Sequence, residues 1–234
     1  MQTVDMPMKH AEGVLLGTAS IVGIKYNGGV ILATDTLASY GSMVYSNQIN
    51  RIDRLGKHTI IAASGELSDY QEIKNVMMKK VNGESTTDDA EEDEEDKKNS
   101  GKGLGPKELF SYLNRMMYQK RTDMKPLYNT VVVAGVKDKK VFLGQTDMYG
   151  TSFEENYVST GIGAHMVIPL IRKEWNAEFT QEQALSLIKR CFQILYLNHC
   201  FAGKMYKTAI VTDNKVEMSE PITIDTTGRW DIFY

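Results

Sequence analysis

The sequence is poor in cysteine, because its 234 residues contain only Cys191 and Cys200. Two cysteines are too few for the disulfide framework that holds small secreted domains together. Both lie on one predicted helix, nine positions apart, so they are too far apart to pair with each other. The scarcity of cysteine therefore favours a protein of a reducing compartment.

Long hydrophobic runs and an excess of positive charge are also missing. No apolar run approaches the roughly 18 residues that a membrane-spanning helix requires. The segment Met1–Gly17 carries charged residues and has no long apolar core, so we do not expect it to be a secretory signal. Lys and Arg number 27 against 30 Asp and Glu, for a net charge of −3. A general nucleic-acid binder would be basic, so we expect neither nucleic acid nor a membrane among the partners.

Short apolar runs and turn signals predict antiparallel hairpins. The predicted strands comprise residues 19–26, 30–34, 59–64, 130–136, 140–145, 157–160, 207–212 and 216–218. The first hairpin turns at Asn27-Gly28-Gly29, a sequence suited to positive φ. The strand at 30–34 is apolar on both faces, which is typical of a buried strand.

Apolar residues spaced three and four apart predict helices over residues 66–81 and 164–173, and from about 106 and about 180 onward. Gly83 suits the position after the first helix, and Pro106 suits the first position of another. Thr180 and Gln183 form a capping box that opens a long helix reaching about Asn198. Strands and paired helices in this order predict an α+β fold in which helices cover stacked antiparallel sheets.

The segment Glu84–Gly105 interrupts every pattern. It contains an acidic run between Asp88 and Asp96, then lysines, then glycines. Such a run cannot bury enough apolar surface to offset the entropy lost on ordering. We interpret it as a solvated loop insertion; the alternative is a Ca²⁺ loop or an acidic segment that binds a partner. An EF-hand requires alternating oxygen ligands and a glycine at fixed spacing, and this run has neither.

Two motifs that suggest cofactors are weak. Gly161-Ile162-Gly163 lacks the third glycine of a dinucleotide-binding fingerprint and is typical of a tight turn before a helix. His199 and Cys200, with Cys191, project in diverging directions from a helix, and no CxxC or HxxxH pair supports a zinc site. We therefore expect no cofactor and no metal.

The segment Gly17–Asp35, GTASIVGIKYNGGVILATD, resembles the start of a mature proteasome beta subunit. The similarity continues to Ile232, and it is most specific in five motifs. These are LASYGS at 37–42, SGELSD at 64–69, MYQKRTDMKPLYNTVVVAG at 117–135, TGIGAHMVIPLIRK at 160–173 and Trp230-Asp231-Ile232. Within the family, these motifs are most similar to the non-catalytic subunits at the seventh position of the beta ring.

The resemblance implies a four-layer αββα sandwich of the N-terminal nucleophile hydrolase type. It also implies a single domain over residues 18–234, preceded by an N-terminal extension at 1–17 and interrupted by the acidic insertion at 84–105. Active members of the family use an N-terminal threonine, whose hydroxyl attacks the peptide carbonyl while its own α-amino group takes the proton. A lysine paired with an aspartate tunes that site, and a second aspartate and two serines orient the threonine.

The resemblance places a degenerate site on this chain. The nucleophile position falls on Ala19, with Thr18 one residue out of register. A slip of one residue turns a strand side chain to the other face, and the alternative is a β-bulge that restores the register of Thr18. The aspartate is retained as Asp35, whereas the lysine position holds Arg51. An arginine stays protonated and cannot exchange a proton near neutral pH. We expect Asp35 and Arg51 to form a structural ion pair.

The remaining positions depart further. The first serine position is Ile162, and the segment Asn198–Ala202 stands where active members have Arg-Asp-Ala-Tyr-Ser. The aspartate of that segment therefore becomes His199, and the second serine becomes Ala202. The members of a catalytic unit do not compensate for one another, so we expect no hydrolysis.

The resemblance accordingly implies a non-catalytic structural subunit of the 20S proteasome core. Such a subunit contributes to beta-ring assembly and to the association of half-particles, in the cytoplasm and the nucleus. The implied partners are beta-1-type and beta-6-type neighbours in the ring, alpha-ring subunits and beta subunits of the opposing half. The alternative is an active threonine peptidase with Thr18 as its nucleophile, which must begin at Thr18 with a free amine.

Overall fold

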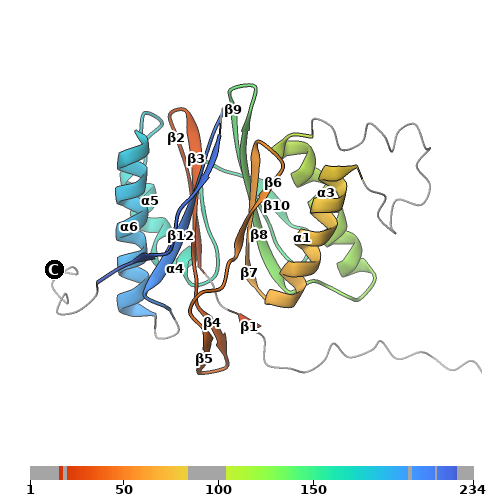
Figure 1. The fold of residues 1–234 in the computed structure, drawn as a ribbon, viewed down its shortest axis with the longest axis horizontal. Coiled ribbons are helices and arrows are strands. Elements are labelled where there is room, and N and C mark those ends of the chain that lie inside the picture. Colours follow the sequence, from red (N-terminus) through yellow and green to blue (C-terminus); the bar gives the residue numbers. More distant parts are fainter. Residues whose placement is uncertain (1–15, 18–19, 84–103, 200–201, 214, 226–234) are drawn as a thin grey trace, which may run out of the picture.

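Two antiparallel sheets lie face to face, and helices cover the outer side of each (Figure 1). The computed structural model describes residues 16–17, 20–83, 104–199, 202–213 and 215–225. One face is covered by α4 (Gly163–Met166), α5 (Ile168–Glu174) and α6 (Gln181–Asn198), and the other by α1 (Leu67–Asn82) and α3 (Pro106–Thr122). The predicted α+β sandwich of four layers, αββα, is confirmed.

The sheet beside α6 has six strands, in the order β11-β2-β3-β12-β13 with β14 also paired to β12. Their bounds are β11 Tyr157–Ser159, β2 Ile21–Tyr26, β3 Gly29–Asp35, β12 Met205–Thr212, β13 Val216–Met218 and β14 Ile222–Thr223. Strands β2 and β3 are joined at Asn27-Gly28, where Gly28 has φ 99°. The predicted turn with positive φ is therefore present.

The sheet beside α1 and α3 has the order β10-β9-β8-β7-β6. Its strands are β10 Ser152–Glu154, β9 Lys140–Thr146, β8 Asn129–Lys137, β7 Thr59–Gly65 and β6 Ile52–Leu55. A small third sheet consists of β1 (Leu16–Gly17), β4 (Ala38–Tyr40) and β5 (Met43–Ser46).

The alternation of side chains along the central strands produces three hydrophobic layers. In β3, Ile31 and Ala33 pack toward α6, while Val30 and Leu32 pack toward the opposite sheet. Strand β8 divides its side chains in the same way between α3 and the opposite sheet. Because both faces are covered, every residue of β3 is buried, and this explains why its sequence is apolar without alternation.

Most predicted helices and their ends are present. Gly83 follows α1 with φ 73°, Pro106 stands at the start of α3, and Thr180 and Gln183 form the capping box of α6. The single helix predicted at 164–173 is wrong: the structure has two short helices, α4 and α5, that meet at Val167. Pro169 has no backbone N–H to donate, so it cannot continue a helix from α4.

The two terminal segments and the insertion fall mostly outside the described residues. Of the expected extension 1–17, the structure describes Leu16–Gly17, which pair with β4 and so contact the domain. Of the acidic insertion 84–105, it describes Leu104 and Gly105, and the N–H of Gly105 donates to the Glu108 carboxylate at 2.8 Å. The motif Trp230-Asp231-Ile232 lies outside the described residues.

Candidate functional site

The start of β2 is the point where the segments of the predicted site meet. The C=O of Ser20 accepts the N–H of Asp35 at 3.2 Å, and the N–H of Ile21 donates to Thr160 Oγ1 at 3.3 Å. Ser159 Oγ donates to the C=O of Ile21 at 2.9 Å. The end of β3 and the segment before α4 therefore flank Ser20. Thr18 and Ala19, which immediately precede it, lie outside the described residues.

Asp35 is buried and joins two backbone segments. Its Oδ1 accepts the N–H of Leu37 at 2.8 Å, and its Oδ2 accepts the N–H of Gly203 at 3.2 Å. Burial raises the pKa of Asp35 to about 6, against the lowering effect of these two hydrogen bonds and of the Arg51 charge. The carboxylate therefore connects the end of β3 to the loop before β12, although its charge is poorly solvated there.

Arg51 is fully buried just before β6. Its Nη1 donates to the C=O of Gly65 at 3.1 Å. Burial lowers the pKa of Arg51, the charge of Asp35 raises it, and a guanidinium stays protonated in proteins. The structure thus places the charges of Asp35 and Arg51 near enough to act on each other, while the hydrogen bonds given above go to backbone groups.

The C=O group that accepts the hydrogen bond from Arg51 belongs to Gly65, a position that requires glycine. Gly65 has φ 99°, and a Cβ at this position would lie 2.2 Å from the C=O oxygen of Tyr128. A side chain there is excluded both by the conformation and by the space. Arg51 is therefore held in a fixed environment, which suits a structural role.

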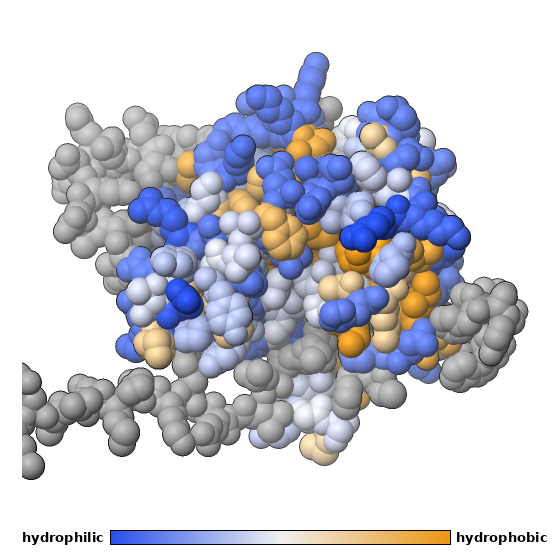
Figure 2. Space-filling model, turned by 180° about the vertical axis from the view of Figure 1, so that it is seen from behind, coloured by the Kyte–Doolittle hydropathy of each residue, from blue (hydrophilic) through white to orange (hydrophobic). Residues whose placement is uncertain are grey.

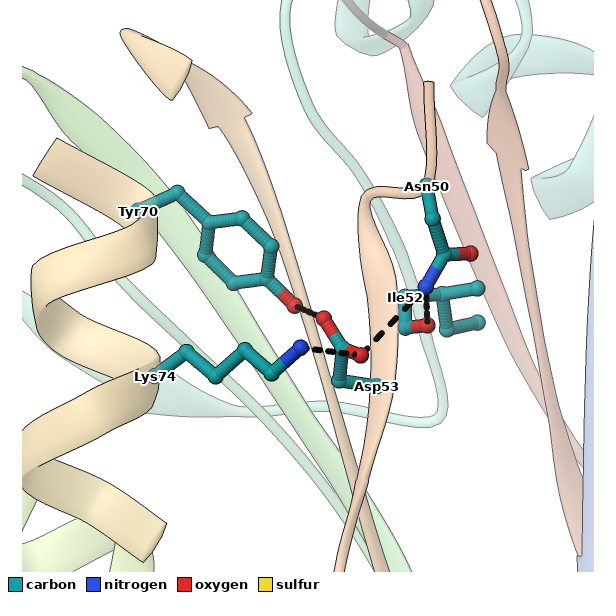
Figure 3. A network of polar contacts seen from close by, with 5 residues as sticks. All are labelled: Asn50, Ile52, Asp53, Tyr70 and Lys74. Carbon is teal, nitrogen blue, oxygen red and sulfur yellow. Dashed lines mark hydrogen bonds and ion pairs between the residues drawn. The ribbon is translucent and has the colours of Figure 1, made fainter. Parts of the chain in front are cut away.

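A polar network fixes the strand that follows Arg51. The Asp53 carboxylate accepts hydrogen bonds from Tyr70 Oη at 2.8 Å, Lys74 Nζ at 2.8 Å and Asn50 Nδ2 at 3.3 Å (Figure 3). Tyr70 is buried, and its burial raises its pKa well above the ordinary value. The network connects β6 to α1. Asp53 was not among the residues that the sequence singled out, because a single aspartate in a short strand carries no recognisable pattern.

Two of the other predicted positions, Ile162 and Ala202, carry side chains without a polar atom, so they cannot orient a nucleophile. Ile162 precedes α4 and is 37% exposed, and its side chain has no polar atom. Ala202 is half-buried, and its N–H donates to the C=O of His199 at 3.0 Å. His199 follows the last residue of α6, and burial lowers its pKa below the ordinary value.

Two residues near Asp35 were missed by the sequence analysis. Tyr196 Oη donates to the C=O of Met205 at 2.7 Å, and both burial and the charge of Asp35 raise its pKa. A Cβ at Gly203 would lie 3.0 Å from Asp35 Oδ1 and 3.2 Å from Leu37 Cβ. Gly203 directly follows the segment 198–202. A glycine at this position could have indicated that the backbone there lies close to another part of the chain.

A pocket of about 280 Å³ lies beside the partners of Asp35, between the β4–β5 hairpin and the start of β12. Lys204 is the charged residue among those that line it. The part of the chain that the structure describes contains no group of three or more His, Cys, Asp or Glu residues able to hold a metal ion. Among the described helices, none is both long and apolar enough to cross a membrane.

Comparisons with known proteins identify the family of the chain. A family model described as "Proteasome subunit" matches residues 14–211. Proteasome subunit beta type-4 of Arabidopsis thaliana is 37% identical over 215 residues, which cover 92% of this chain and 83% of that protein. Proteasome subunit beta type-4 of Xenopus laevis is 35% identical, with coverage of 97% and 89%. Proteasome subunit beta type-7 of Saccharomyces cerevisiae is 32% identical, with coverage of 89% and 78%.

Proposed function

Because the chain belongs to the proteasome subunit family, we propose that it is a non-catalytic beta subunit of the 20S core, which acts in protein degradation. Its similarity to the beta type-4 subunits extends over nearly its whole length. The observation that carries the proposal is the buried Arg51, whose guanidinium is fixed on the carbonyl of Gly65.

The residues around Ser20 support the absence of catalysis. A threonine hydrolase needs groups that move a proton at the nucleophile and groups that orient it. Here Arg51 keeps its proton, and the side chains of Ile162 and Ala202 can neither donate nor accept a hydrogen bond. Asp35 remains, and its oxygens bind the backbone N–H groups of two segments. The fold of a hydrolase is therefore kept while the chemistry is lost.

Assembly with other alpha and beta subunits follows from the family. The finer arrangement is part of the proposal: beta-1-type and beta-6-type neighbours in the ring, contacts with the alpha ring, and contacts with the opposing half that help to join half-particles. We also propose the cytoplasm and nucleus as its location. The ring neighbours are supported by the motifs that resemble the seventh-position subunits, such as SGELSD at 64–69.

The proposal is tested by purifying the chain from its native source through a C-terminal tag. We expect it to elute at the mass of a complete core particle, together with alpha and beta subunits. The N-terminal residue of the chain is then determined from the same sample. Native material that elutes only as a free monomer, without alpha and beta subunits, would overturn the assembly, and a chain that begins at Thr18 with a free amine would favour the active peptidase instead.

A further inference from the structure

The pocket beside the partners of Asp35 has two walls, which come from distant parts of the chain. One wall is the β4–β5 hairpin, which projects from the edge of the sandwich (Figure 1). The other wall consists of residues 202–205, at the start of β12. Both walls are held by the Asp35 carboxylate, which accepts the N–H groups of Leu37 and Gly203. The pocket is therefore built on backbone segments whose relative position is fixed.

The pocket combines apolar side chains with one positive charge. Leu37, Met43, Val44 and Met205 supply apolar groups, and Lys204 supplies the charge. Met43 is 67% exposed and Val44 is 68% exposed. In Figure 2 the hairpin projects at the lower edge of the molecule in pale and light orange colours, so its surface is not strongly hydrophilic. Exposed apolar side chains that border a pocket indicate a contact with another group.

The last strand that the structure describes brings the chain to this pocket. Strand β14 pairs with the start of β12, with Thr223 opposite Met205. The N–H of Ile224 then donates to the C=O of Lys204 at 2.9 Å. Because Lys204 and Met205 both line the pocket, the residues that follow Asp225 begin beside one of its walls.

The size of the pocket favours a single side chain as its occupant. Its volume is about 280 Å³, whereas pockets for whole drug-sized ligands occupy about 300–1,000 Å³. The sequence after Asp225 reads TTGRWDIFY, so Trp230 follows Asp225 by five positions. Five residues reach at most about 17 Å, which limits Trp230 to the surroundings of this wall.

We propose that Trp230 of the same chain fills this pocket, with Asp231 beside Lys204. Tryptophan is highly buried on average in folded proteins, and its ring supplies a large apolar area to cover Met43 and Val44. Asp231 directly follows it and has the charge opposite to that of Lys204. Phe233 and Tyr234 are also aromatic, but neither has an acidic residue next to it.

The contact gives the Trp-Asp motif a role within the subunit itself. It joins the C-terminal segment to the β4–β5 hairpin and to the start of β12, the two segments that Asp35 also connects. All of its parts belong to one chain, so the inference does not depend on the proposed function. The other possible occupants, a second copy of the chain or a different subunit, are separate outcomes of the test.

The first test replaces Trp230 with the photoreactive residue p-benzoylphenylalanine in the full chain. On illumination a benzophenone inserts into nearby C–H bonds and prefers methionine, and Met43 and Met205 lie in the two walls of the pocket. We expect a link within the chain to Met43 or Met205, identified by mass spectrometry of the peptides. The same residue placed at Tyr118, on α3 in the opposite helix layer, is the control and should give neither link. A link from position 230 to another chain, or no link to either methionine, would overturn the inference.

The second test measures the oxidation of Met43 by hydrogen peroxide in unlabelled chains. Trp230→Ala should raise the rate several-fold because it uncovers the sulfur, whereas Trp230→Phe should leave the rate close to that of wild type. Met124, which is 70% exposed after α3, is the internal reference and should react equally in all three chains. A Met43 rate that is the same in wild type and Trp230→Ala would overturn the inference.

Discussion

Asp35 offers the sharpest test of the view that the remaining acidic residue of the site is structural. Its burial raises the pKa to about 6 from the ordinary value of 3.8. The folded chain therefore binds this proton more tightly than the unfolded chain does. The resulting stabilisation is greatest below about pH 4 and is lost as the pH rises to about 6.

The shift corresponds to about 3 kcal/mol of unfolding free energy across that interval. Asp35→Asn removes the titration, so the variant should lack this decrease. At pH 7 two effects oppose each other in the variant. It no longer buries a charge, but its amide nitrogen can accept neither N–H, so one of the Leu37 and Gly203 donors loses its partner at a cost of about 1–3 kcal/mol. We expect a net change at pH 7 of no more than about 2 kcal/mol. Asp35→Ala leaves both donors unpaired and should be clearly less stable.

The assay is urea unfolding of the full chain at closely spaced pH values from 4 to 8, for wild type, Asp35→Asn and Asp35→Ala. Other carboxylates titrate in the same range, so the quantity to compare is the difference in unfolding free energy between wild type and Asp35→Asn at each pH. As the pH rises from 4 to 6, wild type should lose stability relative to Asp35→Asn. Above that range the difference in unfolding free energy should stay constant. A difference that is constant with pH, or that shifts in favour of wild type, would refute the reasoning.

Three further substitutions test the packing around the site. Tyr70→Phe removes a buried hydrogen bond to Asp53 and should lower the unfolding free energy by about 2 kcal/mol, as measured by urea denaturation. Lys74→Ala should cost less than Tyr70→Phe in the same assay, because the Lys74 side chain is 39% exposed and exposed ion pairs contribute at most about 1 kcal/mol; an equal or larger loss would count against this ranking. Gly203→Ala places a methyl group 3.0 Å from Asp35 Oδ1 and should speed hydrogen exchange at the amides of Leu37 and Gly203; unchanged exchange would show that the loop adjusts freely.

The sequence predicted the central strands and long helices well, because their patterns arise from burial. Strand β3 is apolar because both of its faces are covered. The capping box at Thr180 predicted the start of α6. The short strands β1, β4, β5, β6, β10 and β14 were not predicted. Strand β5 is largely exposed on both faces, so no alternation of apolar and polar residues marks it.

The candidate site was predicted unevenly for a similar reason. Asp35, Arg51 and Ala202 were identified from their positions in the resemblance. The structure brings Asp35 close to Arg51 and to Gly203, which follows Ala202. The support around them, from Tyr196, Gly203 and the Asp53 network, depends on contacts between residues far apart in the chain. Such contacts leave no local pattern. The prediction of an ion pair between Asp35 and Arg51 included their opposite charges. It did not include the backbone groups to which both side chains hydrogen-bond.

The most direct test of the central claim is the intact mass of this chain in native core particles treated with an epoxyketone probe for N-terminal threonine proteases. The account predicts that the chain is present in the particle and keeps its unmodified mass while other beta subunits gain the probe. A chain that carries one probe molecule at Thr18 would contradict the account.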